Sequence, residues 1–301
     1  MSGQVWVAGE VLIDLIPEAD QYLSTVGGGP ANTAKALAKL GVKTYFIDGI
    51  STDDHGQIAK ADLLTANVLL DYATYSNKPT CTAKVTLSKS GDATYEFVVE
   101  DTATFDFSEQ WLPDPRNITP SLLHIGTLAT VIEPGASVLF DWAQSVARVA
   151  PIVFDPNIRS AVLGDRDKYV KKVEKWVAIS SAIKVSDEDL YWLYPDKSID
   201  EIVKNWLEVG VQLVVVTLGE QGITAYRKNE QVSVEAVKVD VADTVGAGDT
   251  VGAVLIEAIV NNDLDKLTGE LLQTILNRAA KAAAITVSRT GANPPSKEEI
   301  D

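Results

Sequence analysis

The sequence contains very little cysteine and histidine, which excludes two kinds of site. Cys81 is the only cysteine in 301 residues, so no disulfide can form within the chain, and a reducing cytoplasm is the expected location. The two histidines, His55 and His124, are far apart in sequence, and no Cys/His cluster accompanies either of them. A zinc site is therefore not expected.

Basic residues and long apolar runs are also scarce. The chain has 26 Lys and Arg residues against 42 Asp and Glu residues, which gives a formal net charge of −16. A nucleic-acid partner is not expected, because such binding needs basic surface to neutralise phosphates. A membrane partner is not expected either, because no segment approaches the roughly 18 apolar residues of a span, and no basic region precedes the short N-terminal apolar run.

What is present is the composition of an ordinary globular protein, with 46% apolar and 23% charged residues. Short apolar runs typical of strands alternate along the chain with longer runs that have helical spacing. The expected strands cover 5–9, 45–50, 121–125, 152–155, 182–185 and 211–218, and the expected helices cover 30–40, 53–64, 134–149, 167–178, 199–208 and most of 264–288. This alternation predicts an α/β fold with a mostly parallel sheet covered by helices on both faces.

The most informative segment is 243–250, DTVGAGDT, which precedes an apolar run typical of a buried helix. Small residues at a helix start let backbone N–H groups converge on an anion, and the helix dipole favours negative charge there. Asp249 would repel a resting anion, but it suits a hydroxyl that must lose its proton. An anion hole beside a base indicates phosphoryl transfer to an alcohol.

A second glycine-rich segment, 27–32 (GGGPAN), comes just before an expected helix. It allows a ligand to approach the backbone closely, and Asn32 offers the donors and acceptors that sugar hydroxyls require. A plain tight turn with proline at the first helical position explains the glycines equally well. Neither the G-x-G-x-x-G dinucleotide spacing nor a G-x-x-x-x-G-K-[ST] P-loop occurs, so P-loop kinases are excluded.

Polar residues follow several expected strands, where parallel sheets usually bind ligands. Asp14, shortly after the first strand, offers a carboxylate to two hydroxyls or caps a turn. Arg159 could clamp a phosphate, since its planar fork matches phosphate geometry, or lie on the surface. The glycines of 217–222 (TLGEQG) would let a nucleotide lie against this loop, or form a simple turn.

One region interrupts the alternation of strands and helices. Residues 82–87 and 93–99 form two alternating runs around 88–92 (SKSGD), a hairpin pattern, and 14–26 is expected to add extended structure. Without intervening helices these strands should form a small separate sheet. Such a sheet is either an edge decoration or a lid, and we favour a lid because a phosphoryl donor must be shielded from water.

Taken together, these segments resemble the ribokinase/PfkB family of sugar kinases. Segment 27–32 matches the family's first motif, and 243–249 matches its second, D-T-x-G-A-G-D. The resemblance extends over the whole chain and is strongest to bacterial fructokinases at 9–17, 154–159 and 184–189. It implies a single three-layer α/β/α ribokinase-like domain over 1–301, with a β-sheet lid from about 14–26 and 71–105. It also implies ATP-dependent phosphorylation of a hydroxymethyl group, with Mg²⁺ and often a stimulating K⁺.

The resemblance assigns roles to the matched positions. Asp249 would be the general base, the backbone of Gly246, Ala247 and Gly248 the anion hole, and Arg159 a neighbour of the transferred phosphoryl group. The sugar-binding positions are Asp14, Gly28, Gly29, Asn32 and Asp249. The ATP-site positions are Lys184, Thr217, Gly219, Gly222, Gly248, Asn277 and Ala280. The positions of the potassium loop are Asp243, Val245, Thr286, Arg289 and Gly291.

The chain departs from the family pattern at three places. The magnesium-linked N-x-x-E motif appears as Ser186-x-x-Asp189, whose shorter carboxylate favours a water-mediated contact with Mg²⁺ over direct coordination. Val251 replaces a usual aromatic residue after the base. Ala280 stands where a polar residue often contacts adenine, with Asn277 one turn earlier, so the adenine contacts stay open.

A neutral sugar is the expected substrate, and D-fructose, phosphorylated at its 6-hydroxyl, is our choice. Relatives acting on 2-keto-3-deoxygluconate place a lid arginine where this chain has Val98 and Val99, and burying a carboxylate without a cation is costly. Sugar phosphates are disfavoured for the same reason. A nucleoside, with Tyr95 or Phe97 as stacking partner, and a non-catalytic sugar or nucleotide sensor are the alternatives. Exposed lid strands would also allow a homodimer.

Overall fold

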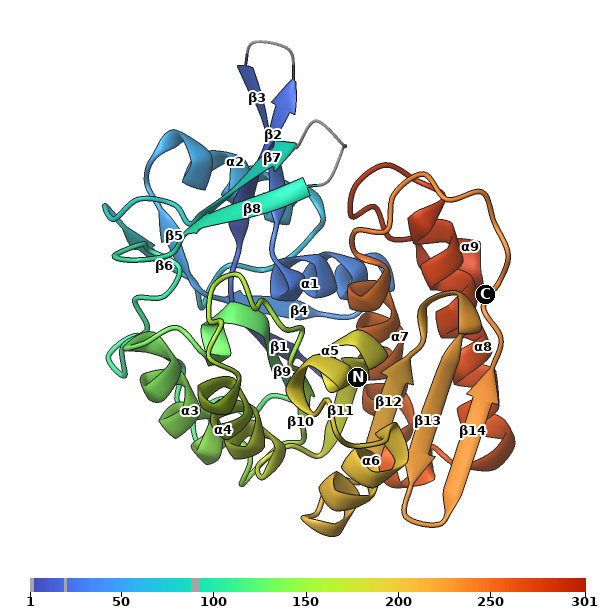
Figure 1. The fold of residues 1–301 in the computed structure, drawn as a ribbon. Coiled ribbons are helices and arrows are strands. Elements are labelled where there is room, and N and C mark those ends of the chain that lie inside the picture. Colours follow the sequence, from blue (N-terminus) through green and yellow to red (C-terminus); the bar gives the residue numbers. More distant parts are fainter. Residues whose placement is uncertain (1–2, 19–20, 88–92) are drawn as a thin grey trace.

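The computed structural model describes residues 3–18, 21–87 and 93–301, and it contains a large central sheet (Figure 1). The strand order is β14-β13-β12-β11-β10-β9-β1-β4. The parallel strands are β1 (Val5–Ala8), β4 (Thr44–Ile47), β9 (Leu122–Gly126), β10 (Ile152–Asp155), β11 (Ala182–Ser186) and β12 (Leu213–Thr217), and the antiparallel ones are β13 (Ile223–Arg227) and β14 (Glu230–Val234). This arrangement confirms the mostly parallel sheet.

Helices cover both faces of this sheet. The helices that belong to one face are α1 (Gly29–Lys39), α2 (Asp54–Thr65), α7 (Ala247–Asn262), α8 (Gly269–Val287) and α9 (Lys297–Ile300). The helices of the opposite face are α3 (Gly135–Val146), α4 (Arg166–Val177), α5 (Asp187–Leu193) and α6 (Ile199–Glu208). Short 3₁₀ turns are η1 (Thr127–Thr130), η2 (Gly219–Gln221) and η3 (Leu264–Lys266). The three-layer α/β/α architecture is confirmed.

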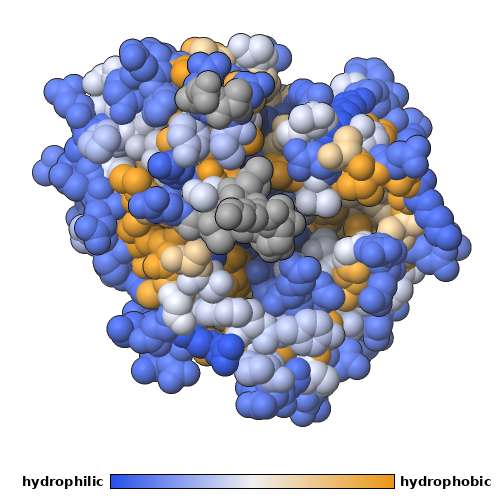
Figure 2. Space-filling model, turned by 45° about the horizontal axis from the view of Figure 1, so that its top comes forward, coloured by the Kyte–Doolittle hydropathy of each residue, from blue (hydrophilic) through white to orange (hydrophobic). Residues whose placement is uncertain are grey.

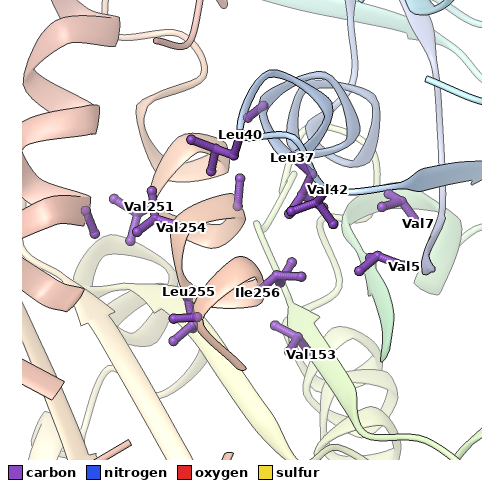
Figure 3. Close-up of a cluster of buried hydrophobic side chains, with 14 of the residues drawn as sticks. Val5, Val7, Leu37, Leu40, Val42, Val153, Val251, Val254, Leu255 and Ile256 are labelled. Atoms are coloured by element: carbon purple, nitrogen blue, oxygen red, sulfur yellow. The ribbon is translucent and has the colours of Figure 1, made fainter. Parts of the chain in front are cut away.

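Two apolar cores lie on the two faces of the sheet, because successive side chains of a strand point to opposite faces. In β1, Val5 and Val7 belong to the core beneath α1 and α7, whereas Trp6 packs into the core beneath α3 and α4. Figure 3 shows Leu37 of α1 and Ile256 of α7 converging on the first core. This packing fixes the N-terminal ends of α1 and α7 beside each other.

A smaller four-stranded sheet projects beside α1 and α2 (Figure 1). Its order is β3-β2-β7-β8, from β2 (Leu12–Glu18), β3 (Gln21–Gly27), β7 (Thr82–Leu87) and β8 (Ala93–Val98). The predicted hairpin of 82–87 and 93–99 is therefore present as β7 and β8, while its turn, 88–92, lies outside the described residues. Among the described residues, no helix is both long and apolar enough to cross a membrane.

Several elements differ from the sequence expectation, and among them the antiparallel strands β13 and β14 were not predicted. The expected strand 45–50 is divided between β4 in the central sheet and β5 (Gly49–Ser51), which pairs with β6 (Thr74–Ser76). The division falls at Asp48, whose buried carboxylate accepts hydrogen bonds from Val11 N (2.9 Å) and Gly49 N (2.7 Å). Helix α5 was not expected, because its pattern is short and acidic.

Candidate active site

A cavity of about 500 Å³ lies between the small sheet and the carboxyl-terminal ends of the central strands. Figure 2 views the face from which the small sheet projects, where hydrophilic residues dominate and apolar residues show between them. Residues from seven separate parts of the chain line the cavity. They include Glu10, Asp14, Gly28, Gly29, Asn32, Phe97, Asn157, Arg159, Lys184, Val245, Gly246, Gly248 and Asp249. The structure thus brings the predicted base, sugar-binding residues and Arg159 together.

Helix α7 starts at the cavity with the predicted anion hole. Gly246 caps the helix with φ of 81°, a left-handed conformation that favours glycine, and a Cβ here would lie 2.8 Å from Ala292 Cβ. The Gly246 carbonyl accepts hydrogen bonds from Thr250 N (2.9 Å) and Thr250 Oγ1 (2.8 Å). The amides of Gly248 and Asp249 have no partner within the described chain, so they are available to an anion.

Asp249 lies in the first turn of α7 and is buried. Burial raises the pKa of its carboxyl to about 6, while the charge of Lys184 and a hydrogen bond from Asn32 oppose the shift. Asn32 Nδ2 donates that hydrogen bond to Asp249 Oδ2 over 2.9 Å. A carboxylate with a pKa close to neutrality can accept a proton from a hydroxyl at pH 7.

The N-terminus of α1 is shaped by two glycines that allow close approach. Gly28 has φ of 105°, and a Cβ here would lie 2.4 Å from the Glu10 carbonyl oxygen. A Cβ at Gly29 would lie 2.8 Å from Asn157 Nδ2 and 3.3 Å from Asp249 Oδ1. Nearby, Asn32 Oδ1 is buried without a partner in the described residues, so it can accept a hydrogen bond from a ligand hydroxyl.

Asp14 and Glu10 add carboxyl groups to the cavity wall. Burial raises the pKa of Asp14 to about 6, and the charge of Arg159 opposes that shift. Glu10 accepts a hydrogen bond from Ala129 N (3.1 Å), and burial raises its pKa to about 7. Glu10 was not predicted as a site residue, although it stands in the segment that carries Asp14.

Lys184 reaches the cavity from β11 as half of a buried ion pair. Its Nζ lies 2.7 Å from Asp155 Oδ2, and the two side chains are 6% and 5% exposed. Burial alone would lower the pKa of Lys184, but the charges of Asp155 and Asp249 outweigh it and raise the pKa. A Cβ at Gly248 would lie 2.9 Å from Lys184 Nζ, so this ammonium contacts the anion hole directly.

The predicted potassium loop lies beside the start of α7. Asp243 joins its two parts, because Oδ1 accepts from Val245 N (3.0 Å) and Oδ2 accepts from Gly291 N (2.9 Å). Thr286 is fully buried and shares a 2.9 Å hydrogen bond with Thr250, while Arg289 forms an ion pair with Glu299. Backbone carbonyls in such a loop suit a monovalent cation, and the described residues contain no cluster of three or more acidic, histidine or cysteine ligands.

The predicted ATP-site residues outside the cavity lie around β12 and α8. Thr217 ends β12, Gly219 begins η2 with φ of 55°, and Gly222 closes the turn with φ of 106°. On α8, Asn277 is exposed and Ala280 packs into the first core. Figure 1 shows α8 beside β13 and β14, and none of these predicted ATP-site residues lines the cavity.

Comparison with known proteins gives a family match over almost the whole chain. The model of the pfkB family carbohydrate kinases matches residues 3–299. A fructokinase of Rhizobium leguminosarum bv. trifolii is 33% identical over 261 residues, covering 85% of this chain and 79% of that protein.

Solved structures give the same fold. A Xylella fastidiosa fructokinase with bound ATP has a TM-score of 0.92 at 22% identity and covers 100% of this chain and 97% of its own. A double mutant of Vibrio cholerae fructokinase, bound to fructose, ADP and a potassium ion, has a TM-score of 0.85 at 26% identity, covering 97% and 94%.

Proposed function

The chain belongs to the pfkB family of carbohydrate kinases, and on this premise we propose that it transfers the γ-phosphoryl group of ATP to the 6-hydroxyl of D-fructose. The products are fructose 6-phosphate and ADP. The observation that carries the proposal is the buried Asp249 carboxylate, held by Asn32 beside the unpartnered amides of α7. The family match also confirms the resemblance drawn from the two glycine-rich motifs.

Each residue of the cavity has a distinct part in the proposed reaction. Asp249 accepts the proton of the sugar hydroxyl. The hydroxyl oxygen bonds to the γ-phosphorus of ATP while the bond from the γ-phosphorus to the ADP oxygen breaks. The unpartnered amides at the start of α7 and Lys184 stabilise the negative charge of the transferring group, with Arg159 as a further cation. Asp14 and Asn32 Oδ1 accept hydrogen bonds from other hydroxyls of the sugar.

The charges of the cavity favour a neutral sugar. Glu10, Asp14 and Asp249 place carboxyl groups in the cavity wall, whereas Lys184 is paired with Asp155 and Arg159 is assigned to the phosphoryl group. A sugar acid would bring its own carboxylate into this surrounding, and Val98 and Val99 supply no cation. The 2-keto-3-deoxygluconate alternative is therefore disfavoured. A nucleoside stays an alternative because Phe97 lines the cavity, while the side chain of Tyr95 lies outside what the structure describes.

We propose Mg²⁺ and K⁺ as the ions of the reaction. Mg²⁺ bound with ATP would neutralise the charge of its phosphates, and we propose that the ion contacts the protein through water. K⁺ would be held by the loop of Asp243, Val245 and the 286–291 carbonyls. Asp243 fixes this loop against α7, whose amides receive the phosphoryl charge.

We also propose that the small sheet is the lid and that it supports a homodimer. The described part of the sheet exposes large apolar side chains, with Tyr22 46%, Leu23 51% and Val98 48% exposed. Outer strands β3 and β8 each pair on one side only in the described chain, and such edges favour pairing with a second copy. The proposed location is the cytoplasm, where the lone Cys81 would remain reduced.

A coupled ADP-release assay with a panel of acceptors tests the proposed function. The panel contains fructose, other neutral hexoses and ribose, 2-keto-3-deoxygluconate and a purine nucleoside, each with Mg²⁺, ATP and KCl. Fructose should give the highest kcat/KM, and phosphorus NMR should place the phosphate on the 6-oxygen. A higher kcat/KM for another acceptor would replace fructose as the substrate. No ADP above background with any acceptor would favour the sensor alternative.

A further inference from the structure

The loop that follows β10 is anchored by side chains from two helices. Ile158 N donates a 2.9 Å hydrogen bond to Asp189 Oδ1 in the first turn of α5. Arg159 N donates a 3.2 Å hydrogen bond to the hydroxyl of Tyr169 in α4. The main chain at Ile158 and Arg159 is thereby fixed to helices α5 and α4.

This anchored loop sets the direction of the Arg159 guanidinium. Its Nη1 donates to Asn157 Oδ1 (2.7 Å) and to the Ile158 carbonyl (2.9 Å), which folds the side chain onto its own loop. Arg159 lines the cavity, and its Nε and Nη2 atoms have no partner in the described part of the chain. Asn157 adopts a left-handed φ of 38° and contacts the Gly29 position, so the loop also meets the start of α1.

Asp189 itself is committed to this anchoring. Its backbone N donates to Ser186 Oγ (3.0 Å), the cap of α5, and this holds Asp189 in the first turn. Its side chain is not among the residues that line the cavity. Its Oδ1 is already engaged by the Ile158 amide. In the Ser186-x-x-Asp189 variant of the magnesium-linked motif, the carboxylate of Asp189 thus contacts the main chain of the β10 loop.

We propose that Asp189 is a positioning residue, whose carboxylate fixes the Ile158 main chain and so aims Arg159 at the transferred phosphoryl group. The proposal rests on the proposed phosphotransfer for its kinetic consequence. It explains why a shorter carboxylate serves here, because the partner is a nearby amide and not an ion further into the cavity. Displacement of a positioned group by about 1 Å can lower a rate roughly 100-fold, so a backbone anchor has a measurable effect.

The kinetic test uses four substitutions, alone or combined. Asp189→Asn keeps an oxygen that can accept from Ile158 N, so kcat should stay within about threefold of wild type. Asp189→Ala removes the acceptor, and kcat should fall roughly 10- to 100-fold with little change in the KM for fructose. In an Arg159→Ala background, Asp189→Ala should cost little more, because both changes remove the same interaction. Asp187→Ala, in the same turn of α5 but without contact to the loop, is the matched control.

A second measurement does not depend on activity. Hydrogen exchange of the peptide containing the Ile158 amide should be faster in Asp189→Ala and unchanged in Asp189→Asn, at equal melting temperature. Mn²⁺ affinity in the presence of ADP, followed by electron paramagnetic resonance, should be the same in all variants.

Other outcomes overturn the proposal. If Asp189→Asn is as impaired as Asp189→Ala and both bind Mn²⁺ more weakly, the residue serves the metal. Full additivity with Arg159→Ala would show that Asp189 does not act through the arginine. A wild-type protein without kinase activity would refute the proposed function, whereas unchanged exchange at Ile158 in Asp189→Ala would refute the anchor.

Discussion

Asn32 Nδ2 lies 2.9 Å from Asp249 Oδ2, although the two residues are 217 positions apart in sequence. The contact joins the first turn of α1 to the first turn of α7, which pack against each other over the first core. It occupies one carboxylate oxygen, while the other, Oδ1, faces the Gly29 backbone. The carboxylate is therefore oriented by one glycine-rich motif to act within the other.

Removing the charge of Asp249 should abolish most of the activity without harming the fold. Asp249→Asn should lower kcat by about 10²- to 10⁴-fold, because the amide cannot accept the hydroxyl proton. Asp240→Asn, an exposed carboxylate outside the cavity, is the control and should behave as wild type. Wild-type turnover in Asp249→Asn, measured by ADP release, would refute the base.

The same carboxyl predicts the pH dependence of activity. Burial raises the pKa of Asp249 to about 6, so the fraction in the active, deprotonated form falls as pH decreases through 6. The kcat/KM should then drop about tenfold per pH unit below that value. Asn32→Ala removes a hydrogen bond that favours the charged form, so its acidic limb should move to higher pH. An acidic limb at or below that of wild type would contradict this assignment.

A raised carboxyl pKa also has a consequence for stability. The folded protein binds the proton more tightly than the unfolded chain does, so Asp249 lowers stability progressively as pH rises from about 4 to about 6. Asp249→Asn removes this effect, and its melting temperature at pH 7.5 should be equal to or above that of wild type. Scanning calorimetry measures both proteins at pH 4 and pH 7.5. A melting temperature of the variant that exceeds wild type only at pH 4 would contradict the raised pKa of Asp249.

The buried ion pair of Lys184 and Asp155 should be sensitive to the loss of one partner. Asp155→Ala leaves an unpaired buried ammonium, and the free energy of unfolding should fall by about 3–5 kcal/mol in urea denaturation. Asp114→Ala breaks a solvent-exposed pair with Arg116 and is the matched control, which should unfold as wild type does. Equal effects of the two substitutions would contradict the difference in burial.

Two glycines one turn apart in α7 should respond in opposite ways to alanine. At Gly248 a Cβ would lie 2.9 Å from Lys184 Nζ, so Gly248→Ala should displace the ammonium and lower kcat/KM for ATP by more than about tenfold. At Gly252 the nearest atom, Lys184 Cδ, is 3.9 Å away, and Gly252→Ala should keep activity and stabilise the helix by up to about 1 kcal/mol. Equal activity in the two variants would refute the close contact.

Replacing Asp243 should remove the proposed stabilisation of the folded protein by potassium. Asp243→Ala removes the acceptors of Val245 N and Gly291 N, so the loop carbonyls lose their arrangement. The melting temperature of wild type should rise in KCl relative to NaCl, because an ion that binds the folded state stabilises it, and the variant should lose this difference. A potassium-specific shift retained in Asp243→Ala would place the ion elsewhere.

Local sequence patterns predicted those parts of the fold that depend on local chemistry. The strand over 152–155 and the helix over 199–208 have the predicted limits, because their apolar spacing is regular and turn residues bound them. The division of 45–50 at Asp48 was not predicted, because the partner of its carboxylate, Val11 N, belongs to a distant segment. The same reasoning explains why α5, which is stabilised by its cap and tertiary contacts, was not expected.

The composition of the site was predictable to a similar extent. Asp249, Asn32 and Asp14 stand in segments whose residue types indicate a base and hydroxyl-binding groups. The structure places all three in the wall of one cavity. The pairing of Asp155 with Lys184 depends on the alignment of β10 with β11, which spacing within either strand does not determine. The place of Glu10 in the site could not be predicted, because its carboxylate is held by the Ala129 amide of η1, which is distant in sequence.

Two of the connections between the small sheet and the rest of the chain are very short. Residues 9–11 alone separate β1 from β2, and Gly28 alone separates β3 from α1. Glu10, Asp14 and Gly28, all in the cavity wall, therefore lie in or beside the two short links that join β2 and β3 to the neighbouring elements β1 and α1. If the small sheet is the proposed lid, binding of the sugar and movement of these strands would be coupled, so ATP would be shielded from hydrolysis only when an acceptor is in place.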